Sequence, residues 1–148
     1  MRIAFGTDET TPLTRAVVER LRRVGHDVDV VADGIDWPDA GRAVGEAVAS
    51  GRAERGVVCC TTGTGVAMAA NKVPGVRAAL CTDAATAAGG RRWNDANVLA
   101  FGLRLSTGTV VDEMLDAFFS TDFDPAEQAL VDRVEPAGSV VGGTGGTP

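Results

Sequence analysis

CCTTGTG at residues 59–65 is the stretch of this chain that decides its fold. An apolar run precedes it and an alanine-rich run follows it, so the pattern predicts a strand, a tight glycine loop and a helix. That order places a thiol beside a row of backbone N–H groups at the positive end of a helix dipole. Such a setting lowers the pKa of a thiol, and aligned N–H groups can hold an oxyanion or a phosphate. A base beside an anion hole suggests proton abstraction next to a carbonyl group.

The rest of the chain alternates short apolar runs with segments of helical periodicity. We expect helices from residue 12 to about 25, ending near 51, after the glycine loop, over 84–88, around 111–118 and from 125 towards 133. The predicted strands are RIAF at 2–5, DVDVV at 27–31, RGVVCC at 55–60, VRAALC at 76–81 and NVLAFG at 97–102. Strands that alternate with helices imply an α/β domain with a five-stranded parallel sheet covered on both faces.

Ligands of such sheets bind beyond the carboxyl ends of the strands. Four polar residues lie at or just after predicted strand ends, namely Asp8, Cys60, Asp83 and Arg104. The loop lacks the GK[ST] ending of a Walker phosphate loop. It half-matches a dinucleotide fingerprint, with Asp83 near the required distance, but it follows the third strand and lacks the third small residue. We therefore expect no cofactor.

Composition bounds the location and the partners of the protein. The 148 residues carry a formal charge of −6 and show no basic cluster, which argues against a nucleic-acid surface. No apolar run approaches the roughly 20 residues of a membrane span, and no signal-peptide pattern opens the chain. Three cysteines without CxxC spacing indicate a reducing cytoplasm and no metal site. Residues 1–136 are expected to form one domain, and residues 137–148 a flexible glycine-rich tail.

Three segments resemble one family. CCTTGTGVAMAANKVPGVRAALCTD at 59–83 is similar to the core signature of the ribose-5-phosphate isomerase B and galactose-6-phosphate isomerase family. RRWNDANVLAFGLR at 91–104 and IAFGTDE at 3–9 resemble two further segments of it. The resemblance implies a Rossmann-like (flavodoxin-like) three-layer sandwich that forms homodimers or homotetramers with shared sites. It also implies interconversion of aldose and ketose phosphates through an enediolate, without metal.

The same resemblance assigns roles to individual positions. Cys60 matches the base, and Thr62 matches a polar threonine that we expect to shuttle a proton between the two substrate oxygens. Substrate-binding and anion-hole positions are Asp8, Glu9, Thr61, Gly63, Thr64, Gly65, Asn94 and Arg104. Among these, the loop N–H groups would hold the enediolate oxygen, and Arg104 would hold a phosphate.

Several positions depart from the family pattern. Trp93 stands where the family has the histidine that opens the sugar ring, and Glu9 replaces another substrate-contacting histidine. Glu127 and Val131 stand where phosphate-binding arginines are expected, and Arg133 comes two positions late. The retained base and anion hole therefore suit an open-chain hydroxycarbonyl compound. A tetrose phosphate needs no ring opening, and a substrate without phosphate would explain the missing arginines.

Plainer interpretations remain beside these. Cys60 could be a small buried hydrophobic residue, as Cys59 and Cys81 are expected to be. Trp93 could stack on a substrate or pack at an interface, and Arg91 could be solvated or reach a partner's anion. The chain as a whole could be a non-catalytic subunit of a hetero-oligomer. It could also be a family member recruited to epimerisation or dehydration.

Overall fold

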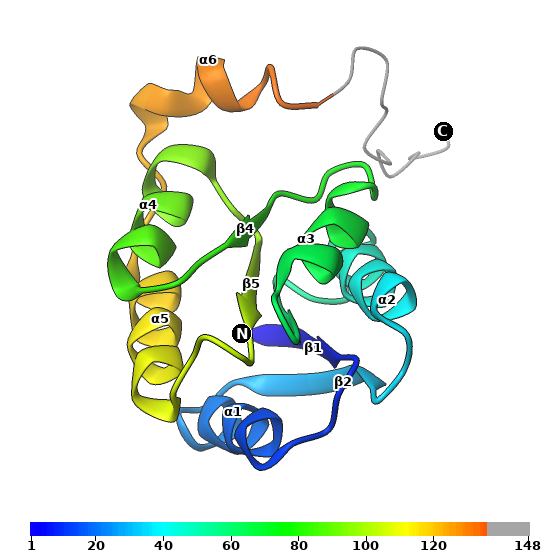
Figure 1. The fold of residues 1–148 in the computed structure, drawn as a ribbon. Coiled ribbons are helices and arrows are strands. Elements are labelled where there is room, and N and C mark those ends of the chain that lie inside the picture. Colours follow the sequence, from blue (N-terminus) through cyan, green and yellow to red (C-terminus); the bar gives the residue numbers. More distant parts are fainter. Residues whose placement is uncertain (136–148) are drawn as a thin grey trace.

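Five parallel strands form the central sheet in the order β2-β1-β3-β5-β4 (Figure 1). The computed structural model describes residues 1–135, so the tail expected at 137–148 lies outside the described residues. The strands are β1 (Arg2–Thr7), β2 (Asp27–Asp33), β3 (Arg55–Cys60), β4 (Ala78–Leu80) and β5 (Val98–Gly102). The sheet and its flanking helices confirm the predicted Rossmann-like three-layer sandwich.

Compared with the flavodoxin order 2-1-3-4-5, strands β4 and β5 have exchanged places, so β4 is the edge strand. All five residues of β5 are buried, which suits a strand with neighbours on both sides. In β4, Ala78 and Ala79 are partly buried and Leu80 is exposed, which suits an edge strand. The burial of each strand therefore agrees with its place in the sheet.

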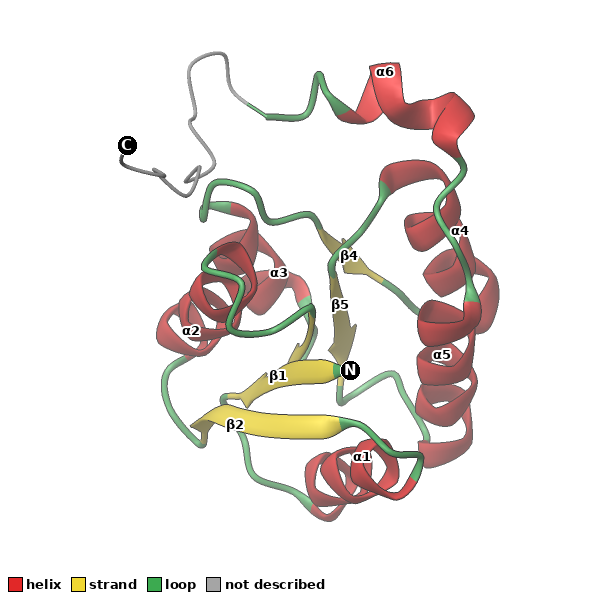
Figure 2. Cartoon of the chain, turned by 180° about the vertical axis from the view of Figure 1, so that it is seen from behind, coloured by secondary structure: helices red, strands yellow, loops and turns green. Residues whose placement is uncertain are grey.

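Helices cover both faces of the sheet (Figures 1 and 2). One face packs against α1 (Pro12–Arg23), α4 (Ala84–Asn94) and α5 (Gly108–Ser120). The other packs against α2 (Trp37–Ala49) and α3 (Thr64–Asn71). A short 3-10 turn, η1 (Pro125–Glu127), and α6 (Gln128–Val131) follow α5. No helix within residues 1–135 has the length and apolar character needed to cross a membrane.

The start of α1 follows the pattern of its sequence. Thr11 is the N-cap, its side chain accepts the backbone N–H of Thr14, and Thr14 returns the bond in a capping box. Pro12 occupies the first turn, where no backbone donor is needed. Asp8 is therefore not needed to cap α1 and remains in the loop after β1.

The helix expected over 84–88 is longer than predicted, because α4 continues through two glycines to Asn94. Gly90 lies against the sheet, where an added Cβ would stand 3.0 Å from the Cβ of Ala79. The glycine thus serves a close helix–strand approach and does not end the helix. As a result, Trp93 and Asn94 lie in the last turn of a helix, not in a loop.

Candidate active site

The glycine loop joins the end of β3 to the start of α3. Gly63 is the N-cap of α3 and adopts φ +76°, a left-handed conformation that glycine adopts without strain. The first helical hydrogen bond runs from Ala67 N to Gly63 O, so the N–H groups of the first turn have no partner within the helix. Gly63 N–H donates to Cys60 Sγ, so the N–H groups at residues 64–66 are the candidates for the anion hole that was predicted over residues 62–65.

The loop after β5 fixes the glycine loop in place. Leu103 donates its backbone N–H to Cys60 O, and Arg104 donates to Thr61 O, both at 2.9 Å. An added Cβ on Gly102 would stand 2.7 Å from the carbonyl carbon and oxygen of Thr62. Gly102 is thus a site-building residue that the sequence did not single out. Its one visible signal is a glycine at the end of a buried strand.

Cys60 lies at the base of the loop with 5% of its surface exposed. Its Sγ accepts the backbone N–H of Gly63 at 3.2 Å, a bond that a thiolate accepts better than a thiol. Cys59 points to the opposite face of the sheet, and burial raises its pKa to about 12. Burial likewise raises the pKa of Cys81 to about 11. Both are core residues, as expected. Cys60 is also buried, in the core of the other face, and it is the cysteine whose Sγ contacts the glycine loop.

Polar side chains surround the mouth of the loop. The hydroxyls of Thr62 and Thr64 lie 2.8 Å apart, close enough to pass a proton. Asp8 follows β1, and its Oδ1 is buried without a hydrogen-bond partner among the described residues. Burial, and to a lesser extent the charge of Glu9, raises the pKa of the Asp8 carboxyl.

A cavity of about 480 Å³ opens beside Thr61, at the start of the glycine loop. It is lined by Glu9, Thr61 and Arg104, together with Thr11, Pro12, Leu13 and Leu103. The loops after β1 and β3 enter helices on opposite faces of the sheet, which creates a crevice at this edge. Of the predicted site residues, Glu9, Thr61 and Arg104 line this cavity within one chain, and Cys60 and Thr62 are not among its lining residues.

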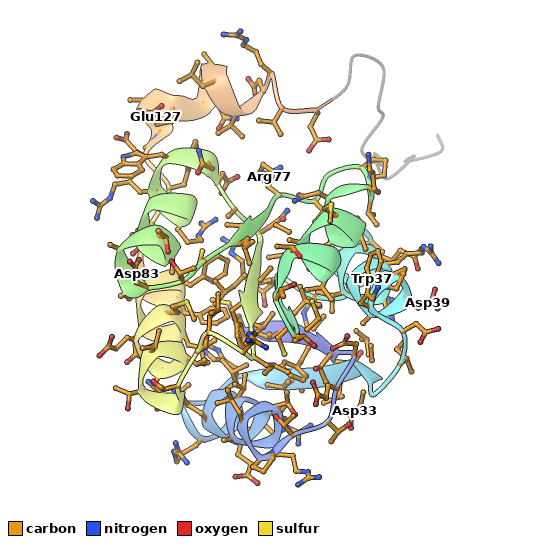
Figure 3. All side chains as sticks on the ribbon, in the orientation of Figure 1. Asp33, Trp37, Asp39, Arg77, Asp83 and Glu127 are labelled. Carbon is orange, nitrogen blue, oxygen red and sulfur yellow. The ribbon has the colours of Figure 1, made fainter. Side chains whose placement is uncertain are left out.

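Trp93 and Asn94 lie elsewhere in the chain. Helix α4 runs back from the carboxyl end of β4 to the start of β5. Asn94 therefore lies near the amino ends of the parallel strands, whereas Gly63 lies at their carboxyl ends. Asn94 instead lines a separate cavity of about 590 Å³ with Lys72 and Arg77. Glu127, on η1, also lies beside the end of α4 (Figure 3). Within one chain, the predicted site residues are therefore divided between the carboxyl and the amino ends of the strands.

Asp83 has a structural role in this fold. It caps α4, and its Oδ1 accepts the backbone N–H of Thr86 at 2.7 Å. That hydrogen bond lowers the pKa of the Asp83 carboxyl. The Asp83 carboxylate is thus occupied by capping α4, whereas in a dinucleotide site it would bind a ribose hydroxyl. Within residues 1–135, no three His, Cys, Asp or Glu side chains are arranged to hold a metal ion.

Comparison with known proteins gives this architecture its class. The family model described as Ribose/Galactose Isomerase matches residues 3–135, so the chain belongs to this family of isomerases. It is 36% identical over 135 residues to galactose-6-phosphate isomerase subunit LacB of Clostridium acetobutylicum. That alignment covers 86% of this chain and 77% of the relative.

Two further relatives bear on the site. D-erythrulose-4-phosphate isomerase of Pectobacterium atrosepticum is 30% identical over 130 residues, covering 84% of this chain and 86% of the relative. The structure of ribose-5-phosphate isomerase B from Clostridium thermocellum superposes with a TM-score of 0.84 at 36% identity. It covers 90% of this chain and 95% of that one. The solved relative thus shares the fold of this chain over 90% of its length.

Proposed function

We propose that this protein is a cofactor-independent aldose–ketose isomerase that acts on a small sugar phosphate or related hydroxycarbonyl compound. The observation that carries the proposal is the contact between Gly63 N–H and Cys60 Sγ, directly below the open N–H groups of α3. It joins a candidate base to a candidate anion hole within one loop. Family membership supports the reaction class, and the loop supports the route.

Cys60, as the thiolate, would remove the proton from the carbon next to the carbonyl group. The electron pair would move to the carbonyl oxygen and form an enediolate, whose charge the N–H groups of residues 64–66 would stabilise. Thr62 would pass a proton from the neighbouring hydroxyl to that oxygen. The Cys60 thiol would then return its proton to the adjacent carbon, which completes the exchange of aldehyde and ketone.

The substrate we favour is one that needs no ring opening. Position 93 carries tryptophan, which can donate only a weak indole N–H bond and is no acid. A tetrose 4-phosphate has its terminal oxygen esterified and stays open, and one relative is named for such a substrate. Arg104 is the cation on the cavity wall that would hold its phosphate.

We also propose that a second copy of the chain completes each site in a homodimer or homotetramer. The support is the separation of Asn94 from Cys60 in one chain. A groove of about 660 Å³ runs between α3 and the edge strand β4, from Thr64 to Asn71, and carries exposed Met68 and Leu80. A copy packed on this groove about a two-fold axis would place its own Asn94 towards the loop.

Deuterium wash-in from heavy water tests the proposed reaction over a panel of aldoses, ketoses and their phosphates. We expect exchange at the carbon next to the carbonyl, with interconversion of the two sugars. Exchange no greater than that of Cys60→Ala would overturn the proposal. Exchange without aldose–ketose conversion would instead point to epimerisation or dehydration.

Mixing inactive variants tests the shared site. Cys60→Ala and Asn94→Ala homo-oligomers should each be impaired, and refolding them together should restore part of the activity, since a mixed dimer contains one intact site. A lack of recovery in a mixture shown to exchange subunits would contradict sharing.

One alternative function has specific support, because the LacB relative is named as a subunit. This chain would then be a non-catalytic partner in a hetero-oligomer. Native mass measurement of the purified chain distinguishes the two. A monomer without exchange activity would favour the partner role, and a stable homo-oligomer with activity would exclude it.

A further inference from the structure

Trp37 begins α2, and its indole ring lies against the glycine loop although it belongs to neither β3 nor α3. A Cβ added to Gly65 would stand 2.9 Å from both Cδ2 and Cε3 of the indole, and the three nearest atoms all belong to Trp37. Trp37 is 45% exposed, so the residue contacts Gly65 on one side and keeps part of its surface open to solvent. Figure 3 shows Trp37 on α2. The loop therefore has an aromatic wall on this side.

The helix that carries Trp37 is itself held closely against α3. An added Cβ on Gly41 would stand 2.6 Å from the carbonyl oxygen of Val66 and 2.7 Å from the Cβ of Ala69. One turn later, an added Cβ on Gly45 would stand 2.9 Å from the Cγ2 of Val73. The two helices meet backbone to backbone, which leaves little freedom in their relative position.

The first turn of α3 needs such support. The helix is eight residues long, and isolated helices shorter than about 12 residues are marginal in water. Two of its first three positions, counted from the cap, are glycines, Gly63 and Gly65, which restrict the backbone least. The direction of the N–H groups at residues 64–66 therefore depends on tertiary contacts, and the indole supplies the contact at Gly65.

We propose that Trp37 is a positioning residue of the anion hole: its indole ring holds Gly65 and thereby aims the first-turn N–H groups of α3 at the substrate oxygen. The inference rests on the proposed isomerase function for its catalytic consequence. The Trp37 side chain contacts Gly65 and not the reacting atoms. Its proposed effect is therefore on the preorganisation of the N–H groups. An anion hole that must reorganise stabilises a developing charge less well than one already in place.

The test compares Trp37→Ala and Trp37→Phe with Ile35→Ala. Ile35 is a matched control because it is an exposed apolar residue two positions earlier, outside the contact with Gly65. Amide hydrogen exchange over residues 61–68 measures the loop without any substrate. Steady-state kinetics on the substrate found by deuterium wash-in measure the catalytic consequence.

In Trp37→Ala we expect amide exchange over 61–68 to be about tenfold faster, with unchanged exchange in β5. We expect kcat to fall about 10- to 100-fold while KM changes less than about threefold, because the loss falls on the transition state. Trp37→Phe should recover most of both effects, and Ile35→Ala should match the wild type.

Wild-type loop exchange and wild-type kcat in Trp37→Ala would overturn the inference. A fall in kcat that Trp37→Phe does not rescue, together with faster amide exchange in β5, would also count against it, since that combination points to general destabilisation. If the wild type itself catalyses no deuterium exchange, the proposed function fails. In that case the amide-exchange measurement still decides whether Trp37 positions the loop.

Discussion

Arg91 holds Asp95 at the point where α4 ends: its Nη1 lies 2.9 Å from Oδ1 of Asp95. Arg91 is 5% exposed and also donates to the carbonyl oxygen of Ala96, so the solvated interpretation of this arginine was wrong. The second carboxylate oxygen of Asp95 accepts a bond from Arg77 at 2.9 Å. Asp95 itself adopts φ +46°, a left-handed cap that two guanidinium groups stabilise. Trp93 and Asn94 are presented from this fixed helix end.

Replacing Asp95 by Asn should destabilise the protein. Asparagine tolerates the left-handed backbone, so the change isolates the loss of the carboxylate charge that Arg91 and Arg77 share. We expect the free energy of unfolding to fall by about 2 kcal/mol, because a nearly buried guanidinium loses its counter-charge. Urea denaturation measures the difference.

The control for this change is Asp39→Asn. Asp39 pairs with Arg42 at 3.0 Å on the open surface, where both side chains are more than half exposed. Such pairs contribute little, so the variant should lie within about 0.5 kcal/mol of the wild type. Equal effects of the two variants would show that the Arg91–Asp95 contact has no special role.

The sequence predicted the glycine loop well and its surroundings less well. The tight turn at Gly63 could be predicted because a glycine-rich loop between an apolar run and an alanine-rich run is a local pattern. The length of α4 was missed because Gly90 is there to let the helix pack closely against Ala79 on β4, a contact that the local sequence does not show. Trp37 was missed because its contact with Gly65 joins segments far apart in the chain. Local patterns carry no record of such contacts.

Cys60 and Cys59 form a matched pair for testing the base. Cys60→Ala should lower the rate of deuterium exchange by about 10²- to 10⁴-fold, the usual contribution of a general base. Cys59→Ala should keep the activity and lose about 1 kcal/mol of stability, because Cys59 is fully buried on the other face of the sheet. Exchange rates and urea denaturation of both variants provide the measurement. Equal loss of activity in the two variants would argue that Cys60 acts only through packing.

Asp8 should show a trade between stability and function. Its pKa is raised by burial and by Glu9, so the folded protein binds a proton here more tightly than the unfolded chain does. Stability from this group is therefore present at low pH and is lost as the pH rises from the ordinary value of 3.8 through the raised value.

Asp8→Asn removes that loss, so we expect it to be more stable than the wild type at pH 7 and to gain less at pH 3. Its kcat/KM should nevertheless fall, because Asp8 is one of the positions expected to bind the substrate. Chemical denaturation at both pH values and steady-state kinetics check the two halves. Asp36→Asn, an exposed carboxylate with no side-chain cap bond, is the control. A variant less stable than the wild type at pH 7 would contradict the argument.

Gly65 and Trp37 should be energetically coupled. Gly65→Ala alone drives a methyl group to 2.9 Å from the indole, and such overpacking costs about 1–3 kcal/mol. In a Trp37→Ala background the same methyl group loses its two closest contacts, both with the indole ring, and alanine within a helix is more favourable than glycine by about 0.5–1 kcal/mol. The effect of Gly65→Ala on stability should therefore change sign between the two backgrounds. Urea denaturation of the two single variants and the double variant gives the coupling energy directly. Additive effects within about 0.5 kcal/mol would show that the ring does not press on the loop.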